Sequence, residues 1–161
     1  MARRCRVMSI AFMKEPDGDV FGDIADRPIS PHRNLVTREG LAQIDEEILR
    51  LQAAIARAQQ AQDRSSLARA QRELRYWQSR RASAELVPEV GETSHVHFGS
   101  RVTIRYLDGR EKIFRIVGED EADLAKGSIS HVSPMARALI AKHVGETMRV
   151  GVQDVEIVRI D

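Results

Sequence analysis

Two consecutive runs of residues with coiled-coil spacing constrain the fold of this chain more than any other feature. The first run recurs at intervals of three and four residues, at Leu41, Ile44, Ile48, Leu51, Ile55 and Ala58. It predicts a helix over residues 37–62. The second run follows the turn-forming residues 63–66 and comprises Leu67, Ala70, Leu74, Trp77, Arg81 and Ala84. Two helices joined by so short a turn pack antiparallel. We therefore predict a helical hairpin, a coiled coil, over residues 35–86, about 35 Å long at 1.5 Å per residue.

Residues 95–161 have the two-residue period of β-strands. Residues 96–107 and 111–117 are rich in β-branched and aromatic side chains and flank Asp108-Gly109, a strong hairpin signal. Ser133-Pro134 begins a helix, because Ser is a good cap and Pro suits the first helical position. Further strands are predicted at residues 128–131, 147–152 and 155–160, the last two around Gln153-Asp154. Residues 95–161 should therefore form an antiparallel sheet of four or five strands with one helix, which makes the fold α+β.

The two remaining segments have no regular period. Residues 1–34 contain turn-forming and extended sequence and are expected to be an extended or disordered arm, and residues 87–94 are expected to be a linker. The single cysteine, Cys5, excludes a disulfide within the chain. No run of about 18 apolar residues occurs, and no small-residue cleavage site follows the short apolar stretch 7–13. We expect a cytoplasmic protein that has no membrane partner.

The near-neutral total charge hides a basic segment. The chain has 25 basic and 24 acidic residues, and 21 of the basic residues are Arg. Residues 64–81 contain six Arg and only one acid, Glu73. This basic face of the second helix is either a solvated stripe or a contact for a phosphate backbone, and charge alone does not decide between them.

Few residues suggest catalysis or metal binding. His95 and His97 share one strand face, which is a weak metal signal because no third His or Cys lies nearby in the sequence. The acidic run of Glu119, Asp120, Glu121 and Asp123 is compatible with a solvated loop, a divalent cation site or a charged docking surface. No phosphate-binding loop or hydrolase motif occurs. We expect neither a self-contained enzyme site nor a small-molecule substrate.

Several motifs of the sheet domain resemble the carboxy-terminal domain of the Gre family of bacterial transcript-cleavage factors, the GreA- and GreB-like proteins. The similarity lies in the order, spacing and type of residues, and a helical hairpin also precedes the domain in that family. The motifs are Val96-His97-Phe98-Gly99-Ser100-Arg101-Val102-Thr103, Phe114-Arg115-Ile116-Val117-Gly118-Glu119-Asp120-Glu121-Ala122-Asp123, Ile129-Ser130 and Ser133-Pro134-Met135-Ala136-Arg137-Ala138-Leu139-Ile140.

The resemblance implies a fold and a partner. The sheet domain would have an FKBP-like fold and dock at the secondary channel of core RNA polymerase, with the hairpin reaching toward the active centre. In the family, two acidic residues at the hairpin tip help hold a magnesium ion, and the polymerase itself cuts the RNA. The protein would then have no catalytic residue and no cofactor or metal of its own, apart from that shared magnesium.

The same resemblance assigns residues to the two contacts. The positions that match the docking motifs are Asp120, Glu121, Ala122, Asp123, Ser130, Ser133, Pro134 and Arg137. The basic residues Arg64, Arg69, Arg72 and Arg75 are similar to the family's basic patch, which implies proximity to nascent RNA.

The hairpin tip departs from the family pattern. Asp63 matches the first acidic position, but Ser66 stands at the second and Arg69 at a later Glu. The hairpin is also shorter than the family's by roughly two turns per helix, about 10 Å. Our leading hypothesis is therefore an elongation regulator that binds RNA polymerase at the secondary channel without strong transcript-cleavage stimulation.

Two alternatives remain at this point. One is an active cleavage factor that uses Asp63 as its candidate tip acid. The more remote one is an FKBP-like prolyl isomerase, for which the domain offers only Phe98, Tyr106 and Phe114 as pocket aromatics.

Overall fold

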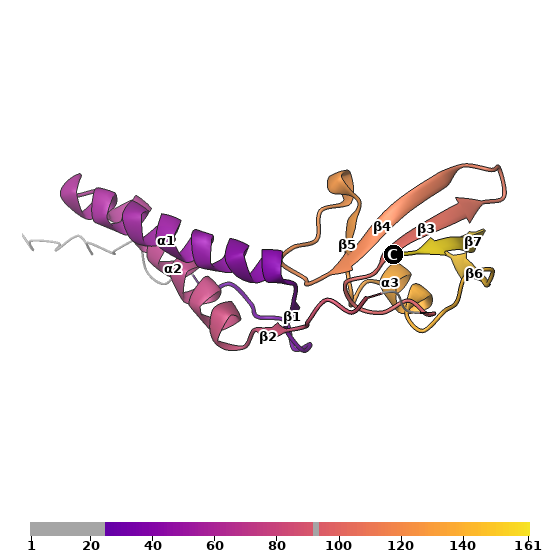
Figure 1. Cartoon of the computed structure of the whole chain (residues 1–161). Helices are drawn as coiled ribbons and strands as arrows, with labels where there is room; N and C mark the ends of the chain where they lie inside the picture. Colours follow the sequence, from indigo (N-terminus) through magenta and orange to yellow (C-terminus); the bar gives the residue numbers. More distant parts are fainter. Residues whose placement is uncertain (1–24, 92–93) are drawn as a thin grey trace, which may run out of the picture.

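The computed structural model describes residues 25–91 and 94–161. A helical hairpin extends away from a small sheet domain, so that the hairpin tip and the β3–β4 turn lie at opposite ends of the molecule (Figure 1). The hairpin consists of α1 (Arg38–Gln60) and α2 (Arg64–Ala82). The predicted α+β architecture, with a hairpin before a sheet domain, is confirmed.

The first apolar run buries its side chains as expected. Ile44, Leu51 and Ala58 of α1 are buried, and Thr37 caps the helix by accepting a hydrogen bond from the Gly40 N–H. Helix α2 differs from the predicted seam. Its buried residues are Ala70, Tyr76 and Arg80, whereas Trp77 is only half-buried and Ala84 lies beyond the helix.

A third segment at the base of the hairpin explains this difference. Residues 25–34 contain no helix or strand, and the chain then forms β1 (Leu35–Val36), which pairs in parallel with β2 (Glu85–Leu86) after α2. Asn34 is buried and donates hydrogen bonds to the Arg80 carbonyl at 2.7 Å and the Ser83 hydroxyl at 3.2 Å. Residues 1–24 of the expected arm lie outside the described residues.

The sheet has five strands in the order β5-β4-β3-β7-β6. Its strands are β3 (Arg101–Tyr106), β4 (Glu111–Val117), β5 (Ser128–Ser130), β6 (Thr147–Val150) and β7 (Gln153–Ile160). Three of the four pairings are antiparallel, but β5 runs parallel to β4. The prediction of a wholly antiparallel sheet is therefore wrong. The loop after β4 and the 3-10 turn η1 (Leu124–Lys126) return the chain to the level of Arg115, so that β5 pairs with the last three residues of β4.

The hydrophobic core lies between this sheet and α3 (Pro134–Leu139). Ala136 and Leu139 of α3 are fully buried in one cluster with residues of β3, β4, β5 and β7. The buried strand and loop residues are Val96, Val102, Ile104, Phe114, Ile116, Ile129, Val155 and Ile157. Alternate residues of β7 supply two of them, as the two-residue period predicts.

Two glycines shift the predicted strand boundaries. Residues 96–100 do not continue β3, because Gly99 has a φ of +92° and the Ser100 hydroxyl accepts from the His97 N–H. The β6–β7 turn lies at Gly151 and Val152 instead of Gln153-Asp154, since Gly151 has a φ of +64°. Both conformations are ones that Gly adopts at low cost.

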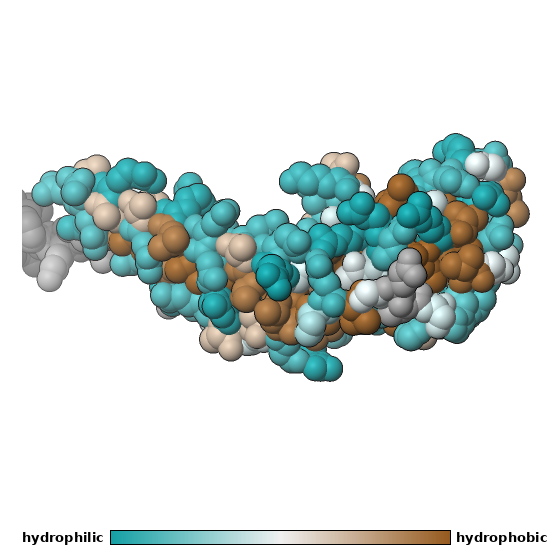
Figure 2. Space-filling model, in the orientation of Figure 1, coloured by the Kyte–Doolittle hydropathy of each residue, from teal (hydrophilic) through white to brown (hydrophobic). Residues whose placement is uncertain are grey.

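The surface of the hairpin is mostly hydrophilic. In the view of Figure 2, the larger hydrophobic areas lie toward the hairpin base and over the sheet domain. Among the described residues, no helix is long and apolar enough to cross a membrane.

Candidate functional site

The hairpin tip carries one carboxylate, and its oxygens are already hydrogen-bonded. Asp63 is the N-cap of α2. Its Oδ1 accepts from the Ser65 N–H at 3.1 Å, the Ser65 hydroxyl at 3.2 Å and the Ser66 N–H at 3.0 Å. Its Oδ2 accepts from the Ser66 hydroxyl at 2.6 Å. These bonds, led by those of Ser66, hold the pKa of Asp63 below its usual value.

The surroundings of Asp63 are basic. Arg64 and Arg69 are exposed, and neither forms an ion pair with any other described residue. Ser66, at the family's second acidic position, donates its hydroxyl hydrogen bond to Asp63. The arrangement therefore makes a well-capped helix start but provides only one ligand for a hard cation, which prefers several carboxylate oxygens.

The four predicted basic residues of α2 lie on one side of the helix. At about 100° per residue, Arg64, Arg72 and Arg75 fall within about 80° of one another and Arg69 lies about 60° further round. Arg75 pairs with Asp26 at 2.5 Å. The Nε of Arg72 is buried without a hydrogen-bond partner. Arg81 lies on a different side and pairs with Asp45 of α1 at 2.6 Å.

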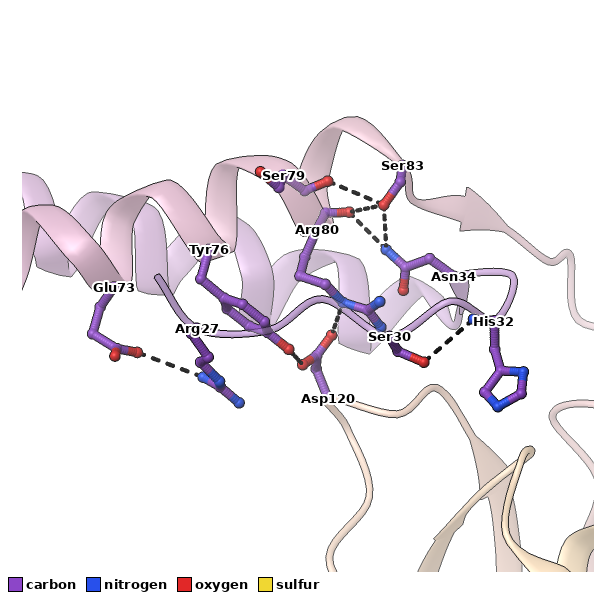
Figure 3. Close-up of polar contacts among 10 residues, drawn as sticks. All are labelled: Arg27, Ser30, His32, Asn34, Glu73, Tyr76, Ser79, Arg80, Ser83 and Asp120. Atoms are coloured by element: carbon purple, nitrogen blue, oxygen red, sulfur yellow. Dashed lines mark hydrogen bonds and ion pairs between the residues drawn. The ribbon is translucent and has the colours of Figure 1, made fainter. Parts of the chain in front are cut away.

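The acidic loop after β4 contacts the hairpin directly. Asp120 accepts from the Tyr76 hydroxyl at 2.6 Å and from the Arg80 Nε at 2.5 Å (Figure 3). The side chains of Arg80 and Asp120 are only 1% and 9% exposed. A desolvated, charge-assisted pair of this kind fixes the geometry of the groups that it joins. We call Tyr76, Arg80 and Asp120 the clasp, because they connect α2 to the sheet domain.

Glu121 makes a second connection, to the start of α1. One of its oxygens accepts from the Thr37 N–H at 2.9 Å and the other from the Thr37 hydroxyl at 2.5 Å. Gly40 permits this approach, since a Cβ at that position would lie 1.9 Å from the Glu121 Cδ. Negative charge at a helix N-terminus is also electrostatically favourable.

The other predicted docking residues are local caps or exposed positions. Asp123 caps η1 through the Ala125 N–H, and the Ser130 hydroxyl accepts from the Val132 N–H. Ser133 caps α3 through the Ala136 N–H, with Pro134 at the first helical position. Ala122, Pro134 and Arg137 are exposed. Of the eight predicted residues, the structure therefore directs Asp120 and Glu121 toward the hairpin and leaves these three available at the surface.

Sequence reasoning missed the hairpin side of these contacts. Tyr76 and Arg80 are four residues apart and outside the apolar seam, which is the only signal that points to them. The sequence marks Thr37 only as the first residue of the predicted helix. Burial, followed by the hydrogen bond to Asp120, raises the pKa of Tyr76 to about 12.

Neither weak chemical alternative gains a site. Among the described residues, no group of three or more His, Cys, Asp or Glu can hold a metal ion. The rings of His95 and His97 are 6.3 Å apart, and His97 is hydrogen-bonded to Ser100. Phe98 and Tyr106 line two different surface hollows, and Phe114 belongs to the core. The three aromatics proposed for an isomerase thus do not share a pocket.

The fold and these surfaces define a class of protein that presents a charged helical hairpin on a sheet domain. Comparison with known proteins gives the family. Residues 91–161 match the family model "Transcription elongation factor, GreA/GreB, C-term". The transcription elongation factor GreA of Phenylobacterium zucineum (strain HLK1) is 34% identical over 151 residues, covering 78% of this chain and 96% of that protein. The chain therefore belongs to the GreA/GreB family of transcription elongation factors.

Other matches concentrate on the sheet domain. The GreA of Pseudomonas syringae pv. tomato is 44% identical over 79 residues, which cover 46% of this chain and 50% of that protein. The alignment with such relatives thus spans about half of their length. Among solved structures, GreA factor homolog 1 (Gfh1) of Thermus thermophilus is 23% identical with a TM-score of 0.40, covering 81% of this chain and 99% of that one. GreA/GreB from Nitrosomonas europaea is 19% identical with a TM-score of 0.40, covering 79% and 98%.

Proposed function

We propose that this protein binds core RNA polymerase at the secondary channel and modulates elongation by occupying that channel, without strong stimulation of transcript cleavage. The observation that carries the proposal is the tip. Asp63 is its single carboxylate, and both carboxylate oxygens accept hydrogen bonds from Ser65 and Ser66. A metal ion at the tip would have to displace those hydrogen bonds. It would then be bound by a single carboxylate, whereas a strong site for a hard cation has several.

The surrounding charge supports the same conclusion. Arg64 adjoins Asp63, and Arg69 lies a little more than one turn further along α2. Two guanidinium groups near a prospective cation site oppose cation binding, because like charges repel. The same groups favour contact with RNA phosphates, since Arg forms bidentate bonds to phosphate.

The shape of the molecule supports channel occupancy. The hairpin extends as a narrow rod from the sheet domain (Figure 1), and α1 has 23 residues, about 35 Å at 1.5 Å per residue. The clasp and the Glu121–Thr37 contact hold the base of this rod against the sheet domain. A rod fixed at its base reaches a defined depth when the sheet domain docks.

The test measures binding and cleavage separately. The purified protein should bind core polymerase, and Arg137→Glu, an exposed change in the proposed docking surface, should weaken binding. Added with magnesium to backtracked complexes, the protein should slow elongation without shortening the RNA. Asp63→Asn should behave as the unaltered protein, because Asn also caps a helix.

Two results would contradict the proposal. Failure of the protein to bind polymerase would remove the partner. RNA shortening by the unaltered protein but not by Asp63→Asn would instead establish the alternative, an active cleavage factor whose tip acid is Asp63.

A further inference from the structure

Residues 25–27 lie against α2 and cover part of its basic and aromatic surface. The guanidinium carbon of Arg27 is 3.8 Å from the ring centroid of Tyr76 and 5.9 Å from that of Trp77. Arg27 also pairs with Glu73 at 3.5 Å (Figure 3). We call residues 25–27 the strap. It is held in place by the cation–π contacts of Arg27 with these two rings and by ion pairs with α2.

Asp26 of the strap binds Arg75, at the end of the basic stripe nearest the hairpin base. Its Oδ1 accepts from the Arg75 Nη2 at 2.5 Å and from the Arg75 Nε at 3.0 Å. The hydrogen bond from Arg75 lowers the pKa of Asp26, and the charge of Arg72 acts in the same direction. A carboxylate therefore lies where a phosphate oxygen would bind to the guanidinium group of Arg75.

The surface beneath the strap has the composition of a single-strand site. Arg64, Arg69, Arg72 and Arg75 extend over about 16 Å of helix at 1.5 Å per residue, and Tyr76 adjoins them. Sites for single-stranded nucleic acid combine a cationic track with aromatic rings on which bases stack. Arg27 covers the Tyr76 ring and Asp26 neutralises Arg75, so the strap blocks both elements together.

We infer that the strap competes in cis with the phosphate backbone of single-stranded RNA for Arg72, Arg75 and the face of Tyr76. This inference rests on the RNA-facing role of α2 in the proposed function. RNA binding at the base of the stripe requires the strap to leave, whereas Arg64 and Arg69 stay accessible in either state. The strap therefore sets how many phosphates the hairpin engages.

The experiment measures anisotropy of a fluorescently labelled single-stranded RNA with the full chain over a range of salt concentrations. Asp26→Asn should make the slope of log K against log salt steeper by about 0.7, the value for one more phosphate on a single strand. Relative to equal affinities at about 1 M salt, this corresponds to roughly fivefold tighter binding by Asp26→Asn at about 0.1 M. The increase should vanish when Arg75→Gln is added.

Asp45→Asn is the matched control. It removes the same charge from an ion pair of similar exposure, with Arg81, away from the basic stripe. It should leave the salt slope unchanged. Equal effects of Asp26→Asn and Asp45→Asn would overturn the inference, as would absence of RNA binding by Asp26→Asn at low salt. Polymerase binding, assayed separately, distinguishes either failure from failure of the proposed function.

Discussion

Removing the carboxylate of Asp120 should destabilise the protein far more than removing an exposed one. Asp120→Ala leaves Arg80 charged, at 1% side-chain exposure, and without the one carboxylate that it binds among the described residues. It also removes the acceptor of the Tyr76 hydroxyl. Breaking a buried pair from one side costs about 3–5 kcal/mol. We expect the lower end, about 3 kcal/mol, because Asp120 retains 9% exposure.

Chemical denaturation and thermal melting measure this effect. At about 2–4 °C per kcal/mol for a chain of this size, Tm should fall by about 6–12 °C. Asp45→Ala, which breaks the exposed pair with Arg81, should cost about 1 kcal/mol or less. The double variant Arg80→Met with Asp120→Asn should recover most of the loss, since it leaves no buried charge and keeps an acceptor for Tyr76. Equal losses for Asp120→Ala and Asp45→Ala would refute the reasoning.

Three further predictions follow from the same contacts. Burial, followed by the Asp120 hydrogen bond, raises the pKa of the Tyr76 phenol from 10.0 to about 12. The neutral phenol therefore stabilises the fold fully below pH 10, and this contribution disappears as pH rises through about 12. Ultraviolet titration should show that the Tyr76 phenolate forms only at this high pH, and at a lower pH in Asp120→Asn. Gly40→Ala should displace Glu121 from Thr37 and lower the free energy of unfolding by about 1–2 kcal/mol. Gly91→Ala should leave the free energy of unfolding unchanged, because the space around Gly91 is open. Equal denaturation curves for the two variants would contradict this prediction. Ser66→Glu adds a second carboxylate in the first turn of α2, where Glu is well accommodated. The variant should increase RNA shortening in backtracked complexes. An unchanged RNA length would show that the missing carboxylate is not what limits cleavage.

The hairpin could be predicted because its information is local. The spacing of Ile44, Leu51 and Ala58 specifies one buried face of a helix, and the short turn at Asp63 requires the second helix to return. The burial of Tyr76 and Arg80 could not be predicted from that period. Their cover comes from residues 25–36 and from the loop at Asp120, and contacts between segments so distant in the sequence leave no local pattern.

The candidate site was only partly accessible to sequence reasoning. The acidic loop stands out by composition, but a carboxylate that binds a partner and one that binds its own chain have the same sequence signal. The structure shows Asp120 and Glu121 bonded within the chain. Likewise, the parallel pairing of β5 with β4 depends on the path of the loop between them. The sequence alone shows that Asp63 is the single acid of the tip, because the residue type at each tip position needs no structure to be known.

Cross-linking from the hairpin tip tests channel occupancy most directly. A photoreactive residue at position 66 of the tip should cross-link to the 3′ end of the RNA and to the active-centre region of a stalled elongation complex. The same group in place of Leu107, which is 87% exposed in the β3–β4 turn at the opposite end of the molecule, should not. Polymerase-bound protein whose tip gives no such cross-links, or gives the same products as position 107, would contradict the account.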